Sequence, residues 1–303
     1  VERKVQILLS KYKTTLPTDL KHKLTPYHSK PPHLCGLPKI HKAGITLSAI
    51  ISSIGSPCYA LAGFLHRILS PFAGKSDSFV KNSAHFVQLL KTVNLHSQDT
   101  LISFDISLFT NVPVDEVLQI VENKLHNDVT LMEGSVLQVE AIMELLEACL
   151  RTNYFQVDDK FFQQKDGMAM GNSLSPIVSN IFMEHFEKLA LDSALYKTSL
   201  WLRYMDDTFV VWPHSPERLQ NIFDHLNSLR PSICFTMETE SDNVISFLDV
   251  LVIREEMGLV TQVNTKPTHT GQYLKFNSNQ PPHVKRDLIK SFHERASTIC
   301  QDQ

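Results

Sequence analysis

The sequence predicts an α+β fold in which an antiparallel sheet packs on helices. Three observations support this prediction. Two short runs rich in aromatic and β-branched residues, 200–203 and 208–212, flank the polar segment Tyr204-Met205-Asp206-Asp207, which is typical of a β-hairpin. A further apolar run over 100–106 predicts a strand, and helical periodicity separates it from the hairpin. Hydrophobic residues make up 43% of the chain, as in globular proteins.

The other elements follow from hydrophobic periodicity and from capping signals. A helical piece is expected at the N-terminus, followed by an extended, loop-rich segment to residue 57. A glycine-bearing loop is expected over 166–171. Helices are predicted over 58–72, 115–125, 135–150, 174–191, 215–229 and 283–299. Further strands are predicted around 154–162 and over 233–239, 245–254 and 260–265.

Charge divides the 303-residue chain into three segments: a basic N-terminal segment 1–57, a core 58–258 and a basic C-terminal segment 259–303. Residues 1–100 carry a net charge of +9, residues 101–258 carry −15 and residues 259–303 carry +3. Basic ends around an acidic centre suit an enzyme of nucleic acids, because cations bind phosphates while carboxylates bind metal. Simple solvation of the acidic surface is the alternative.

Cysteine usage and hydropathy exclude other classes of protein. The five cysteines are scattered and form no Cys-x-x-Cys pair, which predicts a reducing compartment and no structural zinc site. No apolar stretch approaches 18 residues, so we expect a soluble protein that does not span a membrane.

Adjacent carboxylates, Asp206 and Asp207, stand at the expected turn of the hairpin, and Asp105 lies within the strand predicted over 100–106. Neighbouring ionised aspartates repel each other, so a fold tolerates them best where a cation neutralises them. If the strands pair, three carboxylates meet on one sheet and supply the ligand set for two Mg²⁺ ions about 3.5–4 Å apart. A solvated turn is the alternative for an Asp-Asp pair, and the strand context argues against it.

Asp105 precedes Asp206 by 101 residues, with the glycine loop and a helix between them. Short motifs surround these positions: Ser29-Lys-Pro-Pro, Gly36-Leu-Pro-Lys-Ile-His-Lys42, Ile51-Ser-Ser-Ile-Gly-Ser-Pro57, Ser107-Leu-Phe-Thr-Asn-Val-Pro113, Met170-Gly-Asn-Ser-Leu-Ser-Pro176, Phe247-Leu-Asp-Val250 and Lys266-Pro-Thr-His-Thr270. In this order they resemble the reverse transcriptases of Penelope-like retroelements, which are related to telomerase reverse transcriptase. The resemblance covers about residues 25–295.

This resemblance implies a right-hand polymerase with fingers, palm and an incomplete thumb, in which 1–57 belongs to the fingers and 259–303 is thumb-like. It implies DNA synthesis from deoxynucleoside triphosphates on an RNA template with a DNA primer, through an RNA–DNA hybrid, with two Mg²⁺ ions or Mn²⁺ as cofactor. Asp105 and Asp206 would bind both ions, helped by Asp207 and by the backbone carbonyl of Ile106.

Further site residues follow from the same resemblance. The implied nucleotide-binding residues are Lys39, Lys42, Phe109, Met170 and Gly171. The implied primer- and template-binding residues are Tyr204, Met205, Gly167, Lys266, His269 and Tyr273. Surface solvation remains the alternative for the two lysines, and ordinary packing remains the alternative for the glycine loop and for Tyr204.

Two departures from the family pattern bear on activity. The family has an Arg-Pro pair before its Ile-Ser-Ser motif, whereas this chain has Leu47-Ser48-Ala49-Ile50, and serine cannot supply a charged, bidentate contact. The family also places an aromatic gate against the ribose 2′-hydroxyl five residues after the first aspartate, whereas Phe109 is only four residues after Asp105. The alternative function is therefore a catalytically impaired copy of an element that only binds nucleic acid.

Other functions and attachments are constrained more weakly. A two-metal nuclease is disfavoured because no further acidic cluster with a catalytic lysine stands out. Many relatives in the resembled family carry a GIY-YIG endonuclease domain, and no such motif occurs up to Gln303, so we expect any endonuclease domain to lie outside this chain. The resemblance favours a nuclear location over a cytoplasmic one.

Overall fold

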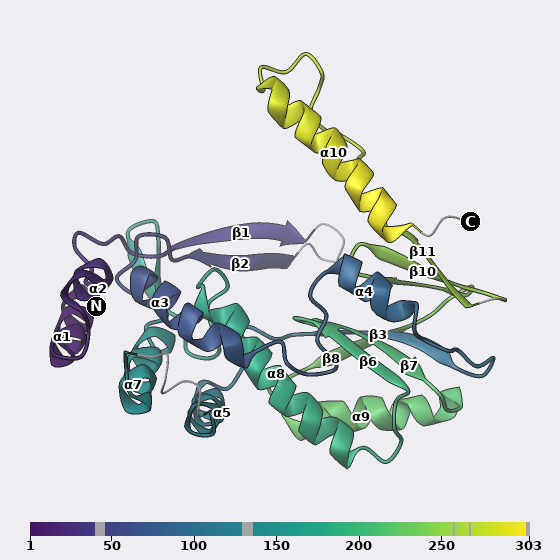
Figure 1. Ribbon diagram of the computed structural model, residues 1–303, viewed down its shortest axis with the longest axis horizontal. Coiled ribbons are helices and arrows are strands. Elements are labelled where there is room, and N and C mark those ends of the chain that lie inside the picture. The colour runs from purple at the N-terminus through teal and green to yellow at the C-terminus, as the bar shows by residue number, and fades with distance from the viewer. Residues whose placement is uncertain (40–45, 129–135, 257, 267, 301–303) are drawn as a thin grey trace. The chain divides into compact units, whose positions relative to one another are not determined.

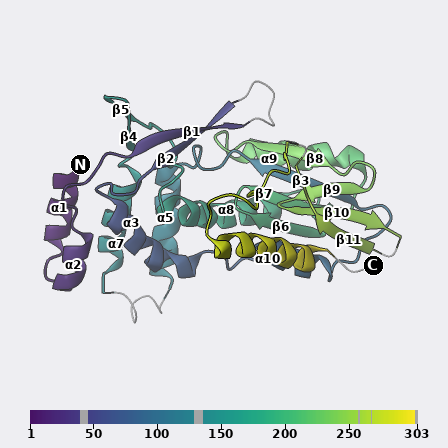
Figure 2. The same ribbon diagram turned by 90° about the horizontal axis from the view of Figure 1, so that it is seen from above.

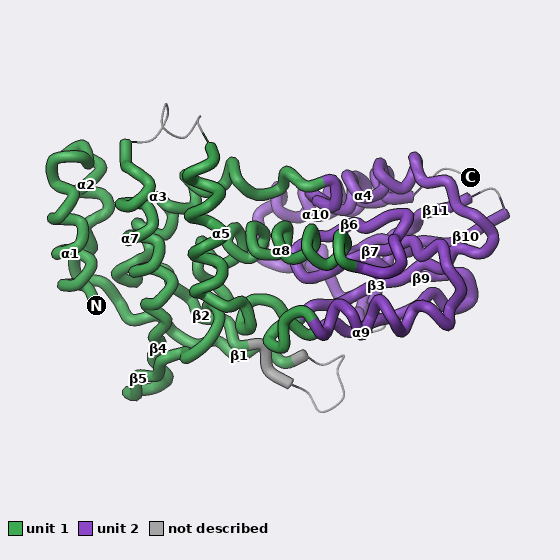
Figure 3. Tube along the Cα trace, turned by 90° about the horizontal axis from the view of Figure 1, so that it is seen from below, with its two compact units in different colours: residues 1–76, 107–193, 229–234 green, residues 77–106, 194–228, 235–303 purple. Residues whose placement is uncertain are grey.

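The computed structural model describes residues 1–39, 46–128, 136–256, 258–266 and 268–300, and the chain divides into two compact units (Figure 1, Figure 3). Unit 1 comprises residues 1–76, 107–193 and 229–234, and unit 2 comprises 77–106, 194–228 and 235–303. The expected core segment 58–258 therefore contributes to both units. The assignment of three consecutive functional segments stays a prediction.

Unit 1 combines a helical bundle with a four-stranded sheet. Its helices are α1 (Glu2–Lys11), α2 (Thr18–Leu24), α3 (Tyr59–Leu69), η1 (Ser70–Phe72, a 3₁₀ turn), α5 (Val114–His126), α7 (Val139–Leu150) and α8 (Leu174–Ser193). Its strands are β1 (His33–Lys39), β2 (Thr46–Ser52), β4 (Tyr154–Val157) and β5 (Lys160–Gln163), in the order β2-β1-β4-β5.

The predicted helices of unit 1 form where their apolar residues can be buried. The stripe of Ile142, Leu145, Leu146 and Cys149 on α7 is fully buried, as expected from its spacing. α8 buries side chains around its whole circumference, which is typical of a helix at the centre of a bundle.

The segment expected to be extended and loop-rich contains a regular hairpin instead. β1 and β2 pair antiparallel from His33↔Ser52 to Lys39↔Thr46. Pro38 lies within β1. Proline has no N–H to donate to a strand ladder, so its presence argued against a strand at this position in the sequence. The structure tolerates it because β1 meets β4 only at His33↔Gln156, far from Pro38.

Unit 2 contains two antiparallel sheets and three α-helices among its described residues. The larger sheet has the order β6-β7-β3-β8 and the smaller β11-β10-β9. The strands are β3 (Thr100–Ile106), β6 (Leu200–Tyr204), β7 (Asp207–Trp212), β8 (Phe235–Thr239), β9 (Val244–Phe247), β10 (Val250–Glu255) and β11 (Gly258–Val263). The helices are α4 (Ser83–Leu90), α9 (Leu219–Leu229) and α10 (Pro282–Ile299), with the 3₁₀ turn η2 (Pro216–Arg218). The predicted α+β class is confirmed.

The strand expected over 245–254 is wrong, because the chain turns at its centre. Phe247 and Val250 pair across a two-residue loop in which Leu248 has φ 55°. Leucine is not a turn-forming residue, so this break could not be predicted from the residue types. Tertiary contacts hold the turn: the carboxylate of Asp249 accepts a hydrogen bond from Ser83 and forms an ion pair with Arg295, whose Nε lies 2.8 Å from Oδ2.

Packing around the larger sheet of unit 2 leaves one end of its covered face open. α4 and the smaller sheet cover most of this face, where Phe86 contacts Phe209 and Phe247 at ring-centroid distances of 5.1 and 4.5 Å. α9 lies on the opposite face, and the side chain of Asn227 binds the backbone of Phe235 in β8 (Figure 1, Figure 2).

Every helix among the described residues is too short or too polar to span a lipid bilayer.

Candidate active site

The Tyr204–Asp207 segment forms the tight turn that the sequence predicts. Tyr204 and Asp207 pair as the last residue of β6 and the first of β7, so Met205 and Asp206 are the two loop residues. Met205 has φ 56°, and Asp206 is not among the residues with positive φ. This φ pattern is that of a type II′ turn, whose twist matches the twist of the flanking strands.

A non-glycine residue at this turn position is strained by about 1–3 kcal/mol, so neighbouring groups must hold it. Arg203 is completely buried, and its Nη1 donates a hydrogen bond of 3.0 Å to the carbonyl oxygen of Met205. The backbone of Arg203 is fixed in turn by hydrogen bonds with Ser78 (2.6 Å) and Val80 (2.8 Å). A buried guanidinium therefore fixes the turn that carries Asp206.

The strands predicted to carry the carboxylates pair with each other within unit 2. The register of β3 and β7 sets Asp105 directly opposite Asp207, and the backbone N–H of Ile106 donates to the carbonyl oxygen of Asp206 at 3.0 Å. Directly opposite residues of an antiparallel pair share one face of the sheet. Tyr204 is paired with Asp207 and therefore lies on this same face, at the end that α4 leaves open.

The three carboxylates interact electrostatically. Burial, followed by the negative charges of Asp206 and Asp105, raises the pKa of Asp207 to about 6, and the ammonium group of Lys266 acts in the opposite direction. The site therefore concentrates negative charge on a partly buried surface, where a cation is stabilised.

We expect Asp207 to make stability depend on pH in the metal-free protein. Its pKa is raised from 3.8 to about 6, so ionisation at higher pH weakens the folded state relative to the unfolded chain. In EDTA, Asp207→Asn should raise the melting temperature above that of the wild type by on the order of 2 °C at pH 7.5. The gain should grow between about pH 4 and pH 6 and vanish below that window.

Thermal melts across this pH range provide the measurement. Asp242→Asn is the control, because Asp242 is exposed in another turn of unit 2. A gain for Asp207→Asn that does not change with pH would show that the substitution acts through packing and not through charge.

The thumb-like segment contributes a small cluster next to these acids. Lys266 is exposed and close enough to Asp207 to shift its pKa. The backbone N–H of His269 donates to the carbonyl oxygen of Lys266 at 2.9 Å, and the His269 ring binds the Tyr273 hydroxyl at 2.8 Å. Tyr273 packs against Phe292 of α10, with ring centroids 4.4 Å apart. The three predicted residues therefore form one connected group in unit 2.

The remaining predicted residues belong to unit 1. The N–H of Met168 donates to the carbonyl oxygen of Phe109 at 2.7 Å, and the N–H of Ile51 donates to that of Met170 at 2.6 Å. Lys39 is the last residue of β1, and Lys42 lies outside the described residues.

Both glycines of the predicted loop are enclosed by protein backbone. A Cβ on Gly167 would lie 2.1 Å from the carbonyl oxygen of Thr110, and a Cβ on Gly171 would lie 2.4 Å from that of Ile51. Their φ values of +68° and +108° also favour glycine. Packing, the alternative left open by the sequence, therefore explains these glycines, and a contact with the template stays a prediction.

The donor set of the hairpin suits Mg²⁺. Mg²⁺ is usually bound by one or two carboxylates together with substrate phosphates, and seldom by a cage of protein ligands alone. Within the described ranges, no group of three or more His, Cys, Asp and Glu side chains is arranged to hold a metal ion. The carboxylates of Asp105 and Asp206 fit an ion whose remaining ligands come from substrate.

Sequence reasoning missed two residues of this region. Arg203 supports the turn from the opposite face, and Thr236 of β8 pairs with Asp105, to whose carbonyl oxygen its hydroxyl donates at 3.4 Å. The alternation Trp201, Arg203 within β6 was the available signal for the first, because it places a charged side chain on the buried face. No signal identified the second, since the pairing of β3 with β8 is decided by the fold.

Comparisons with known proteins agree with this geometry. The profile described as reverse transcriptase (RNA-dependent DNA polymerase) matches residues 50–233, more than half of the chain. A second profile, described as animal helix-turn-helix domain, matches residues 272–303. No curated protein matches the chain.

Several solved structures are similar in fold. A telomerase from Candida albicans, in complex with a TWJ fragment of telomeric RNA, is 14% identical with a TM-score of 0.61, covering 97% of this chain and 53% of that one. An apo telomerase from Candida tropicalis, truncated from its C-terminal domain, is 15% identical with a TM-score of 0.51, covering 75% and 54%. The BmCPV RNA-dependent RNA polymerase at its elongation state is 13% identical with a TM-score of 0.52, covering 81% and 23%. The shared fold is that of right-hand polymerases, and the chain spans about half the length of the telomerases that it matches.

Proposed function

The chain belongs to the reverse transcriptase (RNA-dependent DNA polymerase) family, and from this premise we propose that it extends a DNA primer with deoxynucleoside triphosphates on an RNA template. One observation carries the proposal: the register of β3 and β7 places Asp105 opposite Asp207 and beside the turn that holds Asp206. Carboxylates grouped in this way are the ligands of two-metal phosphoryl transfer.

In this proposal Asp105 and Asp206 hold two divalent cations, with Asp207 and the carbonyl of Ile106 as further oxygen donors. When bound, Mg²⁺ or its substitute Mn²⁺ lowers the pKa of the primer 3′-hydroxyl and offsets charge on the leaving pyrophosphate. The chain itself supplies position, because the hydrogen bond from Arg203 to Met205 holds the turn before substrate arrives.

The neighbouring residues take roles that follow from their placement. Tyr204 lies on the face of the carboxylates and would support the primer end, together with Met205. The exposed ammonium of Lys266 would bind backbone phosphate, with His269 and Tyr273 holding its segment in place. In unit 1, Lys39 and Lys42 are proposed to bind the triphosphate, Phe109, Met170 and Gly171 to line the nucleotide site, and Gly167 to approach the template.

We also propose that the protein derives from a retroelement of the Penelope-like type and acts in the nucleus. The motifs over 29–32, 36–42 and 266–270 support this assignment, since they lie outside the residues matched by the family profile. An endonuclease domain, if the element has one, would lie outside this chain.

The second candidate is a catalytically impaired copy that only binds nucleic acid. It is favoured by Ser48, at the position where the family has arginine, and by the short spacing between Asp105 and Phe109. The loss of a charged contact to the triphosphate removes about 2–4 kcal/mol of transition-state stabilisation. Such a copy keeps its affinity for template and primer.

Extension of an oligo(dT) primer on poly(rA), with Mg²⁺ or Mn²⁺, separates these candidates. We expect extension that requires the metal and the RNA template, because the carboxylates of unit 2 are already grouped. Template-primer binding without extension in either metal would favour the impaired copy. Failure to bind the hybrid at all would contradict both candidates.

A further inference from the structure

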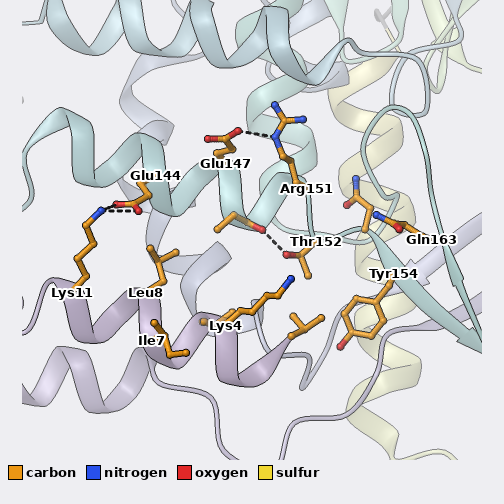
Figure 4. A pocket seen from close by; sticks show the side chains of 14 residues that line it. Lys4, Ile7, Leu8, Lys11, Glu144, Glu147, Arg151, Thr152, Tyr154 and Gln163 are labelled. Carbon is orange, nitrogen blue, oxygen red and sulfur yellow. Dashed lines mark hydrogen bonds and ion pairs between the residues drawn. The ribbon is translucent and has the colours of Figure 1, made fainter.

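A groove in unit 1 is lined by none of the three carboxylates and has its own chemistry. It is a cavity of about 740 Å³ between α1 and the C-terminal part of α7 (Figure 4). One face of α1 lines it with Lys4, Ile7, Leu8 and Lys11, at the i, i+3, i+4, i+7 spacing of a helix. α1 lies outside the residues matched by the family profile, whereas the α7 side of the groove lies within them.

A second cavity borders the groove and reaches the glycine loop. This cavity, of about 610 Å³, shares Arg151, Asn153 and Gln163 with the groove and is also lined by Gly167. The side-chain amide of Asn153 donates to the carbonyl oxygen of Gly167 at 3.1 Å, and the backbone carbonyl oxygen of Asn153 accepts from the backbone N–H of Gln164 at 2.8 Å. A residue that lines both cavities is therefore hydrogen-bonded to that loop.

One positive charge in the groove is available to a ligand. Figure 4 shows the side chain of Lys4 extending along the cavity towards Thr152 and Tyr154. Lys4 has no ion-pair partner within the described part of the chain, whereas Lys11 is paired with Glu144 at 2.7 Å and Arg151 with Glu147 at 2.7 Å. Those pairs neutralise the acids of the groove and leave Lys4 to attract an anion.

Other groups in the groove suit a nucleotide. Tyr154 offers a half-buried ring for base stacking, and the amide of Gln163 offers a donor and an acceptor. Residues 1–30 carry seven Lys/Arg against two Asp/Glu, so the surrounding potential favours a polyanion. An aromatic ring, amides and a cation along one groove are the chemistry by which single strands are bound.

We propose that this groove binds the unpaired 5′ part of the RNA template before it is copied, with Lys4 contacting a phosphate and Tyr154 stacking on a base. The inference rests on the proposed function for the identity of the RNA. The lining residues that the groove shares with the cavity at Gly167 suggest its direction: the single strand would run from α1 towards the loop proposed to approach the template.

Binding to three fluorescent ligands in EDTA tests the inference: an RNA–DNA hybrid with a one-nucleotide 5′ template overhang, the same hybrid with an overhang of about eight nucleotides, and a single-stranded RNA of the long overhang's sequence. Wild-type protein should bind the long-overhang hybrid more tightly than the short one. Lys4→Ala should weaken the long-overhang hybrid and the single strand about 3- to 10-fold and leave the short-overhang hybrid unchanged. The slope of log K against log salt should fall by about 0.7 for the long overhang, the value for one lost phosphate contact on a single strand.

Arg3→Ala is the matched control, because it removes the same charge from the residue of α1 directly before Lys4, and Arg3 does not line the groove. Lys4→Arg should restore the affinity. Three outcomes would each overturn the inference. Arg3→Ala could weaken binding as much as Lys4→Ala does, Lys4→Ala could weaken the short-overhang hybrid as much as the long one, or the wild type could show no preference for the long overhang.

The single-stranded ligand separates this inference from the proposed function. Lys4-dependent binding of single-stranded RNA by a protein that extends no primer would support the groove and count against polymerase activity. Primer extension by a protein without any overhang preference would support the polymerase activity and overturn the inference about the groove. Lys4 is exposed, so melting curves of its variants should match the wild type.

Discussion

Asp206→Asn should reduce primer extension by about a thousandfold or more and leave the affinity for an RNA–DNA hybrid nearly unchanged. The substitution keeps the size of the side chain and removes the charge that would hold a divalent cation in the turn. Hybrid binding depends mainly on cations and backbone shape at other positions, so it does not need this carboxylate. Single-turnover extension and hybrid titration, on the same preparation, provide the two measurements.

The turn itself should survive this substitution. Its geometry depends on the Tyr204↔Asp207 pairing and on the hydrogen bond from Arg203 to the carbonyl of Met205, neither of which uses the Asp206 side chain. Asp242→Asn, in an exposed turn of the same unit, is the matched control and should retain full extension. Extension by Asp206→Asn at the wild-type rate would remove Asp206 from the proposed metal site.

Gly167→Ala should destabilise unit 1 by about 3 kcal/mol or more, the range in which a substitution forces the backbone to move. The new Cβ would lie 2.1 Å from the carbonyl oxygen of Thr110 and 2.7 Å from its Cα, and backbone atoms cannot rotate away as a side chain can. A positive φ of +68° adds strain for alanine. Urea denaturation followed by far-UV circular dichroism should show an earlier first transition.

Gly55→Ala separates the two causes of this effect. Gly55 has nearly the same φ, +73°, but nothing lies within 4 Å of the position that a Cβ would take. Its substitution should therefore show the conformational strain alone, about 1–2 kcal/mol. Equal effects at the two positions would mean that the contact with Thr110 does not restrain the loop.

The carboxylate site could be predicted from sequence because its signal is local. Each flanking run fixes a strand, the polar break fixes the turn, and Asp105 stands out because aspartate is disfavoured within a strand. Only the register between the strands could not be predicted from the sequence. The structure supplies it: β3 and β7 pair so that Asp105 faces Asp207, which a shift of one residue would have moved to the other face.

Features held by contacts distant in sequence were beyond such reasoning. Leu248 adopts a turn conformation because Asp249 next to it is held by Ser83 and Arg295, 166 residues away in one case. Gly167 was assigned to the template on the pattern of its loop, whereas Thr110 fills the space beside it. The backbone of the buried Arg203 is held by Ser78 and Val80, which lie far from it in the sequence.

Periodicity and turn chemistry act over a few residues, so the amino-acid order is enough to predict the α+β class, the hairpin with its two adjacent carboxylates and the third carboxylate within a neighbouring strand. Three features arise only in the folded chain: the register that places Asp105 opposite Asp207, the buried guanidinium that holds Met205 in its strained conformation, and the groove beside α1. Strand register, burial and cavities are set by which distant segments pack together, and the free energy of that packing is not carried by any one segment.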